Sequence, residues 1–106
     1  MNLYSLTKTA SLKVDAVENE QRHPKRTLHS VYLQAQAEMG ELAEEINIAT
    51  GLLKKPAGKD GVLGEAIDSI LCLLDLIHVL DPNIAQGVVN DIAQSKLQKW
   101  VNHVNK

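Results

Sequence analysis

The sequence predicts an all-α fold, arranged as a small four-helix bundle. Apolar residues recur at the three- and four-residue spacing of amphipathic helices, and no stretch alternates between apolar and polar residues as a half-buried strand does. All three prolines fall between these periodic segments. With 106 residues, the chain is expected to form one domain that covers residues 1–106.

Proline and threonine mark the boundary between the first two expected helices. The first runs from Leu6 to about Arg22 and ends before Pro24, which cannot continue a helix. Thr27 then provides the N-cap of a long second helix that extends to about Thr50. These two helices form the first half of the expected bundle.

Glycines and prolines also delimit the second half of the chain. Residues 51–61 contain three glycines, a proline and three lysines, a composition typical of a loop, and Gly51 is the expected stop of the second helix. A third helix follows from Val62 to about Leu80. We expect Asp81-Pro82 to open the fourth helix, with a cap and a proline at its first position.

Two pairs of carboxylates at helical spacing are the main functional signal. Glu38 and Glu41 lie three residues apart in the second helix, and Glu65 and Asp68 lie three apart in the third. Residues three apart share one helix face, so each pair directs its oxygens into one small volume. Four convergent carboxylates predict a site for a hard divalent cation.

An acidic pair on a helix is most often only a solvated surface, because Asp and Glu are rarely buried. The third helix argues against this interpretation, since nearly every direction around it is apolar and such a helix is normally buried. Its acids, Glu65, Asp68 and Asp75, collect in one sector, and buried carboxylates are costly unless paired or bound to a metal. Ligands that are all oxygen favour Mg²⁺, with Mn²⁺ as a substitute, over zinc.

The acidic pattern resembles that of the MazG-type, all-α nucleoside triphosphate pyrophosphatases. Their Glu-Glu-x-x-Glu and Glu-x-x-Asp motifs are similar to Glu38-x-x-Glu41 and Glu65-x-x-Asp68, and the similarity covers roughly residues 20–100. The resemblance implies that these four residues ligate Mg²⁺. One departure is that the first Glu of the family's doublet is Ala37 in this chain.

The same resemblance implies hydrolysis of a nucleoside or deoxynucleoside triphosphate to the monophosphate and pyrophosphate, as part of nucleotide-pool house-cleaning. A triphosphate carries about four negative charges, so an acidic site holds it only through bridging cations. One carboxylate beside the cations would orient or deprotonate the attacking water. Glu41 and Glu45 are both candidates for this catalytic role.

Candidate substrate-binding residues come from three parts of the chain. Lys96 in the fourth helix and Lys54 in the loop could contact phosphates, although the Asn and Arg that often follow the family's lysine are absent here. His23 and Arg26 lie in a connector that borders the base pocket in related hydrolases. Trp100 could stack on a base.

Composition and charge limit the expected partners. With 44% apolar residues, 23% charged residues and a formal charge of -2, the chain gives no reason to expect polynucleotide binding. The single cysteine, Cys72, cannot form an internal disulfide, and the sequence shows no signal-peptide pattern and no span long enough for a membrane. A soluble, cytoplasmic protein is expected.

Surplus apolar surface on the third helix predicts self-association, because three neighbouring helices in so short a chain cannot easily cover it. The family resemblance likewise implies a homo-oligomer, either a dimer or a dimer of dimers, with active sites completed at subunit contacts.

Two other functional classes remain open. One is a non-catalytic helical oligomerisation or regulatory module with a degenerate acidic cluster, which would bind no divalent ion. The other is a di-iron carboxylate bundle, which needs two Glu-x-x-His motifs. Only Glu20-x-x-His23 fits this motif, and Asp75-x-x-His78 is a weaker match with Asp in place of Glu.

Overall fold

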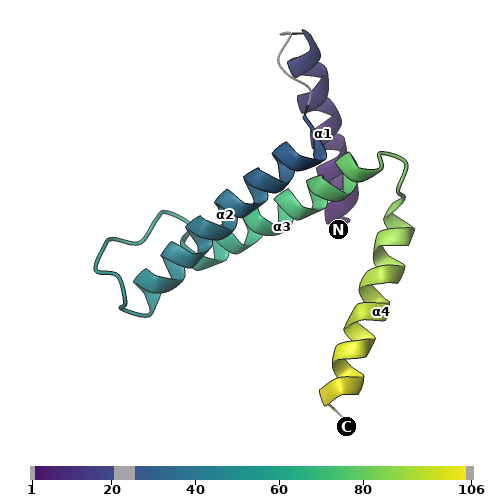
Figure 1. Ribbon diagram of the computed structural model, residues 1–106. Helices are drawn as coiled ribbons and strands as arrows, with labels where there is room; N and C mark the ends of the chain where they lie inside the picture. The colour runs from purple at the N-terminus through teal and green to yellow at the C-terminus, as the bar shows by residue number, and fades with distance from the viewer. Residues whose placement is uncertain (1, 21–25, 105–106) are drawn as a thin grey trace.

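The computed structural model describes residues 2–20 and 26–104, and the regular structure in these ranges is helical throughout. It comprises α1 (Leu3–Glu20), α2 (Leu28–Ala49), α3 (Gly61–Leu80) and α4 (Gln86–Val104). Helices α2 and α3 lie side by side as an antiparallel hairpin, α1 packs against α3, and α4 contacts α1 alone among the helices (Figure 1). The predicted all-α class is confirmed.

Helix α2 begins and ends at the residues that the sequence indicates. The Ser30 N–H donates to Thr27 Oγ1 at 3.0 Å, and the Thr27 N–H donates to Ser30 Oγ at 2.9 Å. This reciprocal capping box satisfies two N–H groups that have no helical partner. At the other end, Thr50 is the C-cap and Gly51 has φ +82°, a left-handed conformation that glycine adopts without strain.

The prediction that Asp81-Pro82 opens the fourth helix is wrong, because α4 begins only at Gln86. Asp81 is instead the extended C-cap of α3. Its side-chain Oδ1 accepts from the Asn83 N–H at 3.0 Å, and its carbonyl accepts from the Ile84 N–H at 3.1 Å. These bonds close a local turn, which is the alternative that aspartate side chains commonly offer to a helix start.

The first helix also starts earlier than expected, at Leu3 rather than Leu6. Its first turn is closed by the Leu6 N–H, which donates to the Asn2 carbonyl at 3.0 Å. Tyr4, 1% exposed, lies on this turn and donates its hydroxyl to the Ile84 carbonyl at 3.1 Å. The buried tyrosine thereby fixes α1 against the chain that leads into α4.

The buried core is small. Among the residues whose burial the structure describes, it contains three apolar and three polar residues: Tyr4, Val31, Ala35, Ser11, Ser69 and His78. Only Ser69 and His78 of α3 are buried within one chain, although a helix that is apolar in nearly every direction is normally buried. The α2–α3 hairpin and α1 cover too little of its apolar surface, and Leu63 remains 74% exposed.

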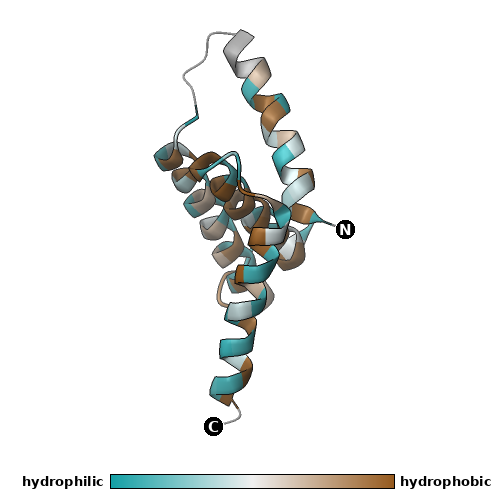
Figure 2. Ribbon diagram, turned by 90° about the vertical axis from the view of Figure 1, so that its right-hand side faces the viewer, coloured by the Kyte–Doolittle hydropathy of each residue, from teal (hydrophilic) through white to brown (hydrophobic). Residues whose placement is uncertain are grey.

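Helix α4 does not join a compact bundle within one chain. It has no buried residue and projects away from the α2–α3 hairpin. Figure 2 shows apolar segments along the hairpin and, interrupted by polar ones, along α4. Its main link to the rest of the described chain is the joint with α1, where Gln86 Oε1 accepts from the Ser5 N–H at 3.0 Å.

A charged cluster joins α1, α3 and the residue before the α2 cap. The guanidinium of Arg26 donates to Asp15 Oδ1 at 2.7 Å and to Asp75 Oδ2 at 2.6 Å, and it also donates to Ser11. The Ser11 hydroxyl donates to Asp75 Oδ1 at 2.7 Å. Hydrogen bonding to Asp15, followed by that to Asp75, raises the pKa of Arg26 well above its usual range despite partial burial.

In the ranges 2–20 and 26–104, no helix combines the length and apolar character that crossing a lipid bilayer requires.

Candidate metal centre

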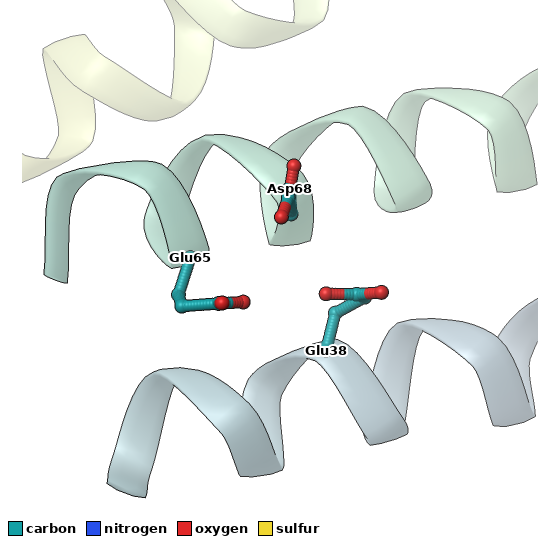
Figure 3. Close-up of side chains that lie close together, drawn as sticks. All are labelled: Glu38, Glu65 and Asp68. Carbon is teal, nitrogen blue, oxygen red and sulfur yellow. The ribbon is translucent and has the colours of Figure 1, made fainter. Parts of the chain in front are cut away.

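Three carboxylates from two helices meet in the space between α2 and α3. Glu38 comes from the middle of α2, whereas Glu65 and Asp68 come from the N-terminal half of α3 (Figure 3). One carboxylate oxygen from each residue lies within 4.8 Å of the other two. The antiparallel hairpin therefore brings together three of the four ligands proposed from the sequence. We refer to Glu38, Glu65 and Asp68 as the acidic cluster.

Two oxygens of the acidic cluster are buried without a partner. Oε2 of Glu38 and Oε2 of Glu65 are hidden from solvent, and neither has a hydrogen-bond donor among residues 2–20 and 26–104. Oε1 of Glu38 does accept a bond, from the Gln34 side-chain amide at 3.2 Å. A buried acceptor without a donor costs free energy, so these two oxygens mark a place where a positively charged ligand would be stabilising.

Electrostatics within the cluster point in the same direction. Burial raises the pKa of Glu38, and the carboxylates of Glu41 and Asp68 raise it further, against a small lowering by the Gln34 amide. Burial likewise raises the pKa of Glu65, with further contributions from Glu41, Asp68 and Glu38. The neighbouring carboxylates therefore oppose the ionisation of Glu38 and Glu65, a repulsion that a bound cation would remove.

Glu41, the fourth proposed ligand, lies at the edge of this cluster. Its side chain is exposed, yet its charge is the largest carboxylate contribution to the raised pKa of both Glu38 and Glu65. Glu41 is therefore close enough to act on the same small volume. It does not belong to the group of three whose oxygens lie within 4.8 Å of one another.

The donor set fits Mg²⁺. All the converging atoms are carboxylate oxygens, which this ion prefers, and in its octahedral shell opposite oxygens lie about 4.2 Å apart, twice the bond length of about 2.1 Å. One oxygen from each residue of the acidic cluster lies within 4.8 Å of the other two, so binding would require the three carboxylates to draw closer together. A cation at this position would also supply the partner that the buried Oε2 atoms of Glu38 and Glu65 lack in the described part of the chain.

Glu45, the second catalytic candidate, faces the loop instead of the acidic cluster. Its Oε1 accepts a hydrogen bond from the Gly58 backbone N–H at 2.8 Å. The adjacent Glu44 points off the acidic face, as the helical phase predicts, and forms an ion pair with Lys55 at 2.6 Å. Both side chains therefore contact the α2–α3 loop.

The candidate substrate-binding residues are scattered within one chain. Arg26 is engaged with Asp15 and Asp75, and Lys54 is exposed in the loop. Lys96 and Trp100 are exposed on α4, which contacts neither helix of the hairpin. His23 lies outside the described residues. Among the described residues, one chain thus does not gather Arg26, Lys54, Lys96 and Trp100 around the acidic cluster.

A mostly apolar cavity of about 460 Å³ opens between α1 and α3, and its lining includes Cys72, Asp75 and Arg26. Burial raises the pKa of the Cys72 thiol, and the charges of Glu38, Asp75 and Asp68 raise it further. The thiol therefore lies between the acidic cluster and the Arg26–Asp75 pair. Cys72 is half-buried.

Sequence reasoning missed several polar partners. Asp15 and Ser11 bind Arg26, and Gly58 binds Glu45. The sequence places Asp75 with the other acids of α3, but the structure separates it and gives it an arginine partner. The spacing of Asp68 and Asp75, nearly two helical turns, was a usable signal that they meet different neighbours.

Comparisons of the chain with protein-family models, with curated proteins and with solved structures gave no match.

Proposed function

We propose that this chain is a Mg²⁺-dependent nucleotide pyrophosphohydrolase, which cleaves nucleoside or deoxynucleoside triphosphates to the monophosphate and pyrophosphate. The observation that carries the proposal is the convergence of Glu38, Glu65 and Asp68 from two helices, with two buried oxygens that have no donor among the described residues. The resemblance of their motifs to those of MazG-type enzymes supports the choice of reaction.

In this proposal Glu38, Glu65 and Asp68 hold the metal, with Glu41 at the edge of the site. Bound Mg²⁺ supplies a positive charge that neutralises the phosphates and lowers the pKa of a bound water. The reaction adds the water oxygen to the α phosphorus and breaks the bond from that phosphorus to the oxygen that bridges the α and β phosphates. Pyrophosphate leaves with the electron pair, and the proton of the water passes to a carboxylate. Glu41 is the better placed of the two candidates, because its charge acts directly on Glu38 and Glu65.

The neighbouring cavity supports a substrate that has an apolar part as well as phosphates. Its volume of about 460 Å³ falls within the usual range for small-ligand sites, roughly 300–1,000 Å³. Cys72 connects its lining to the acidic cluster. A nucleoside triphosphate combines these two requirements. The proposal places the enzyme in the cytoplasm, as a homo-oligomer with a nucleotide-pool house-cleaning role.

Product analysis tests the proposal. Purified protein is incubated with ribo- and deoxynucleoside triphosphates, with Mg²⁺ present or chelated, and the products are resolved by chromatography. Monophosphate and pyrophosphate that form only with Mg²⁺ are the expected result. Formation of diphosphate and phosphate would refute cleavage between the α and β phosphates but would remain consistent with the metal site. Absence of both turnover and Mg²⁺ binding would refute the proposed enzymatic function.

The second candidate function is a helical oligomerisation module, and the observation in its favour is the exposed apolar surface. Leu63 and Leu80 of α3, and Trp100 of α4, are each more than 60% exposed in one chain. More exposed apolar surface than a monomer usually leaves uncovered commonly marks a protein interface. This function would predict a stable oligomer whose assembly is independent of divalent ions.

A further inference from the structure

The loop that joins α2 and α3 folds back along the end of α2. The Leu53 N–H donates to the Asn47 carbonyl at 3.0 Å, and five residues later the Gly58 N–H donates to Glu45 Oε1 at 2.8 Å. As the loop proceeds, its partners on α2 therefore move back toward Glu41. The loop reaches the level of Glu45, which is only one helical turn beyond the edge of the acidic cluster.

Two neighbouring acids fasten this loop, but not equally. The pair between Glu44 and Lys55 is exposed, with the lysine side chain 56% accessible, and exposed ion pairs contribute little. The bond from the Gly58 N–H to Glu45 joins a backbone donor to an ionised acceptor, which is a stronger type of hydrogen bond. Glu45 also contributes to the raised pKa of Lys55, after the larger effect of Glu44, so its charge faces the loop.

The absence of a side chain at Gly58 permits this contact. A Cβ atom at this residue would lie 2.5 Å from Glu45 Oε1, closer than a real Cβ approaches an oxygen. The glycine thus lets the carboxylate lie directly against the loop backbone. Because the obstructing atom is the end of a flexible side chain, an alanine at 58 would displace the carboxylate without preventing folding.

We propose that Glu45 is a positioning residue, whose carboxylate holds the α2–α3 loop at the end of α2, one helical turn beyond Glu41, and does not act as the base of the reaction. The loop carries three lysines, Lys54, Lys55 and Lys59. Holding the loop in place limits where these positive charges lie relative to an acidic site that must receive a polyphosphate. The kinetic part of this inference rests on the proposed function, whereas the fastening of the loop does not.

Limited proteolysis tests the fastening directly. Trypsin cleavage after Lys54 and Lys59 is followed by mass spectrometry under native conditions. Glu45→Ala and Gly58→Ala should each accelerate loop cleavage about tenfold, the effect of losing a hydrogen bond to a charged group. Glu45→Gln should cleave at a rate close to that of the wild type, at most about threefold faster, since the amide oxygen still accepts the bond but no longer carries the charge that strengthens it. The double variant Glu45→Ala/Gly58→Ala should be no faster than either single variant, because both remove the same interaction. Unchanged cleavage in Glu45→Ala would overturn the inference.

Steady-state kinetics of the same variants separate a positioning residue from a base. Glu45→Ala should raise KM for the triphosphate about tenfold and leave kcat within about threefold, while Glu45→Gln stays near wild type in both. If Glu45 were the general base, Glu45→Gln would lower kcat by about 10²–10⁴ while the rate of loop proteolysis stayed normal. This result would overturn the positioning role. If the wild type hydrolyses no triphosphate, the proposed function fails, and proteolysis alone still decides whether Glu45 holds the loop.

Discussion

The guanidinium of Arg26 donates to Asp75 Oδ2 at 2.6 Å and thereby ties the residue before the α2 cap to the middle of α3. The same guanidinium reaches Asp15 on α1, so one side chain connects three segments. Both members of the Arg26–Asp75 pair are mostly buried, with side chains 18% and 19% exposed. Removing one charge of such a pair leaves the other without compensation.

We expect Arg26→Gln to lower the free energy of unfolding by about 2–4 kcal/mol, because the mostly buried Asp75 would keep its negative charge without a cation and the half-buried Asp15 would lose its partner. Urea denaturation measures the change. Lys54→Gln, at an exposed loop position, is the matched control and should alter stability by less than about 0.5 kcal/mol. Weaker triphosphate binding with unchanged stability would instead return Arg26 to the substrate site that the sequence suggested.

Neutralising the acidic cluster should abolish metal binding and preserve the fold. Glu38→Gln and Asp68→Asn each remove a proposed ligand while relieving carboxylate repulsion. We expect Mg²⁺ affinity, measured by calorimetry, to fall by more than about 100-fold, beyond the 10–100-fold typical of losing an outer-sphere partner. Turnover should be lost and the helical circular dichroism retained. Unfolding of both variants would show that the cluster is structural.

The chelated protein should become more stable as the solution is acidified toward the range in which Glu38 and Glu65 gain protons. Both pKa values are raised above their ordinary 4.5, so the folded state binds these protons more tightly than the unfolded state does. This stabilisation is present below the ordinary pKa and is lost as the pH rises through the raised values. Thermal unfolding of the wild type and of Glu38→Gln/Glu65→Gln, in chelator, isolates the effect. Identical pH profiles for the two proteins would contradict it.

Glu44→Gln should be nearly silent. Glu44 points away from the acidic cluster and pairs only with the exposed Lys55 among the described residues, so stability should change by less than about 0.5 kcal/mol. Mg²⁺ affinity and turnover should match the wild type within about twofold, which makes this variant a control for Glu45→Gln. A large loss of activity would mean that the helical phase assigned to α2 is wrong.

Much of the fold could be predicted from local sequence signals. The Thr27 cap, the Gly51 stop and the helix that ends at Leu80 all depend on neighbouring residues, and the structure confirms them. The start of α4 could not be predicted in this way. Asp81 followed by proline is compatible both with a helix cap and with a turn, and the choice depends on which N–H reaches the aspartate oxygen.

The candidate site was predictable as far as helical periodicity extends. Spacing of three residues puts Glu65 and Asp68 on one face, and the antiparallel hairpin then brings Glu38 to them. Periodicity does not reveal which acids meet a cation of the chain itself. Asp75 pairs with Arg26, which lies 49 residues away in the sequence, and Glu45 accepts from the Gly58 N–H, which lies 13 residues away.

The acidic cluster is built entirely from one hairpin, in which α3 follows α2 after a loop of eleven residues, 50–60. Its contacts are therefore local in the chain, and closing so short a loop costs little conformational entropy. Local topology favours rapid folding, so this hairpin should assemble early in the folding reaction, before the distant ends of the chain meet at the joint of α1 with α4. The carboxylates of the acidic cluster would then come together before the native tertiary structure is complete.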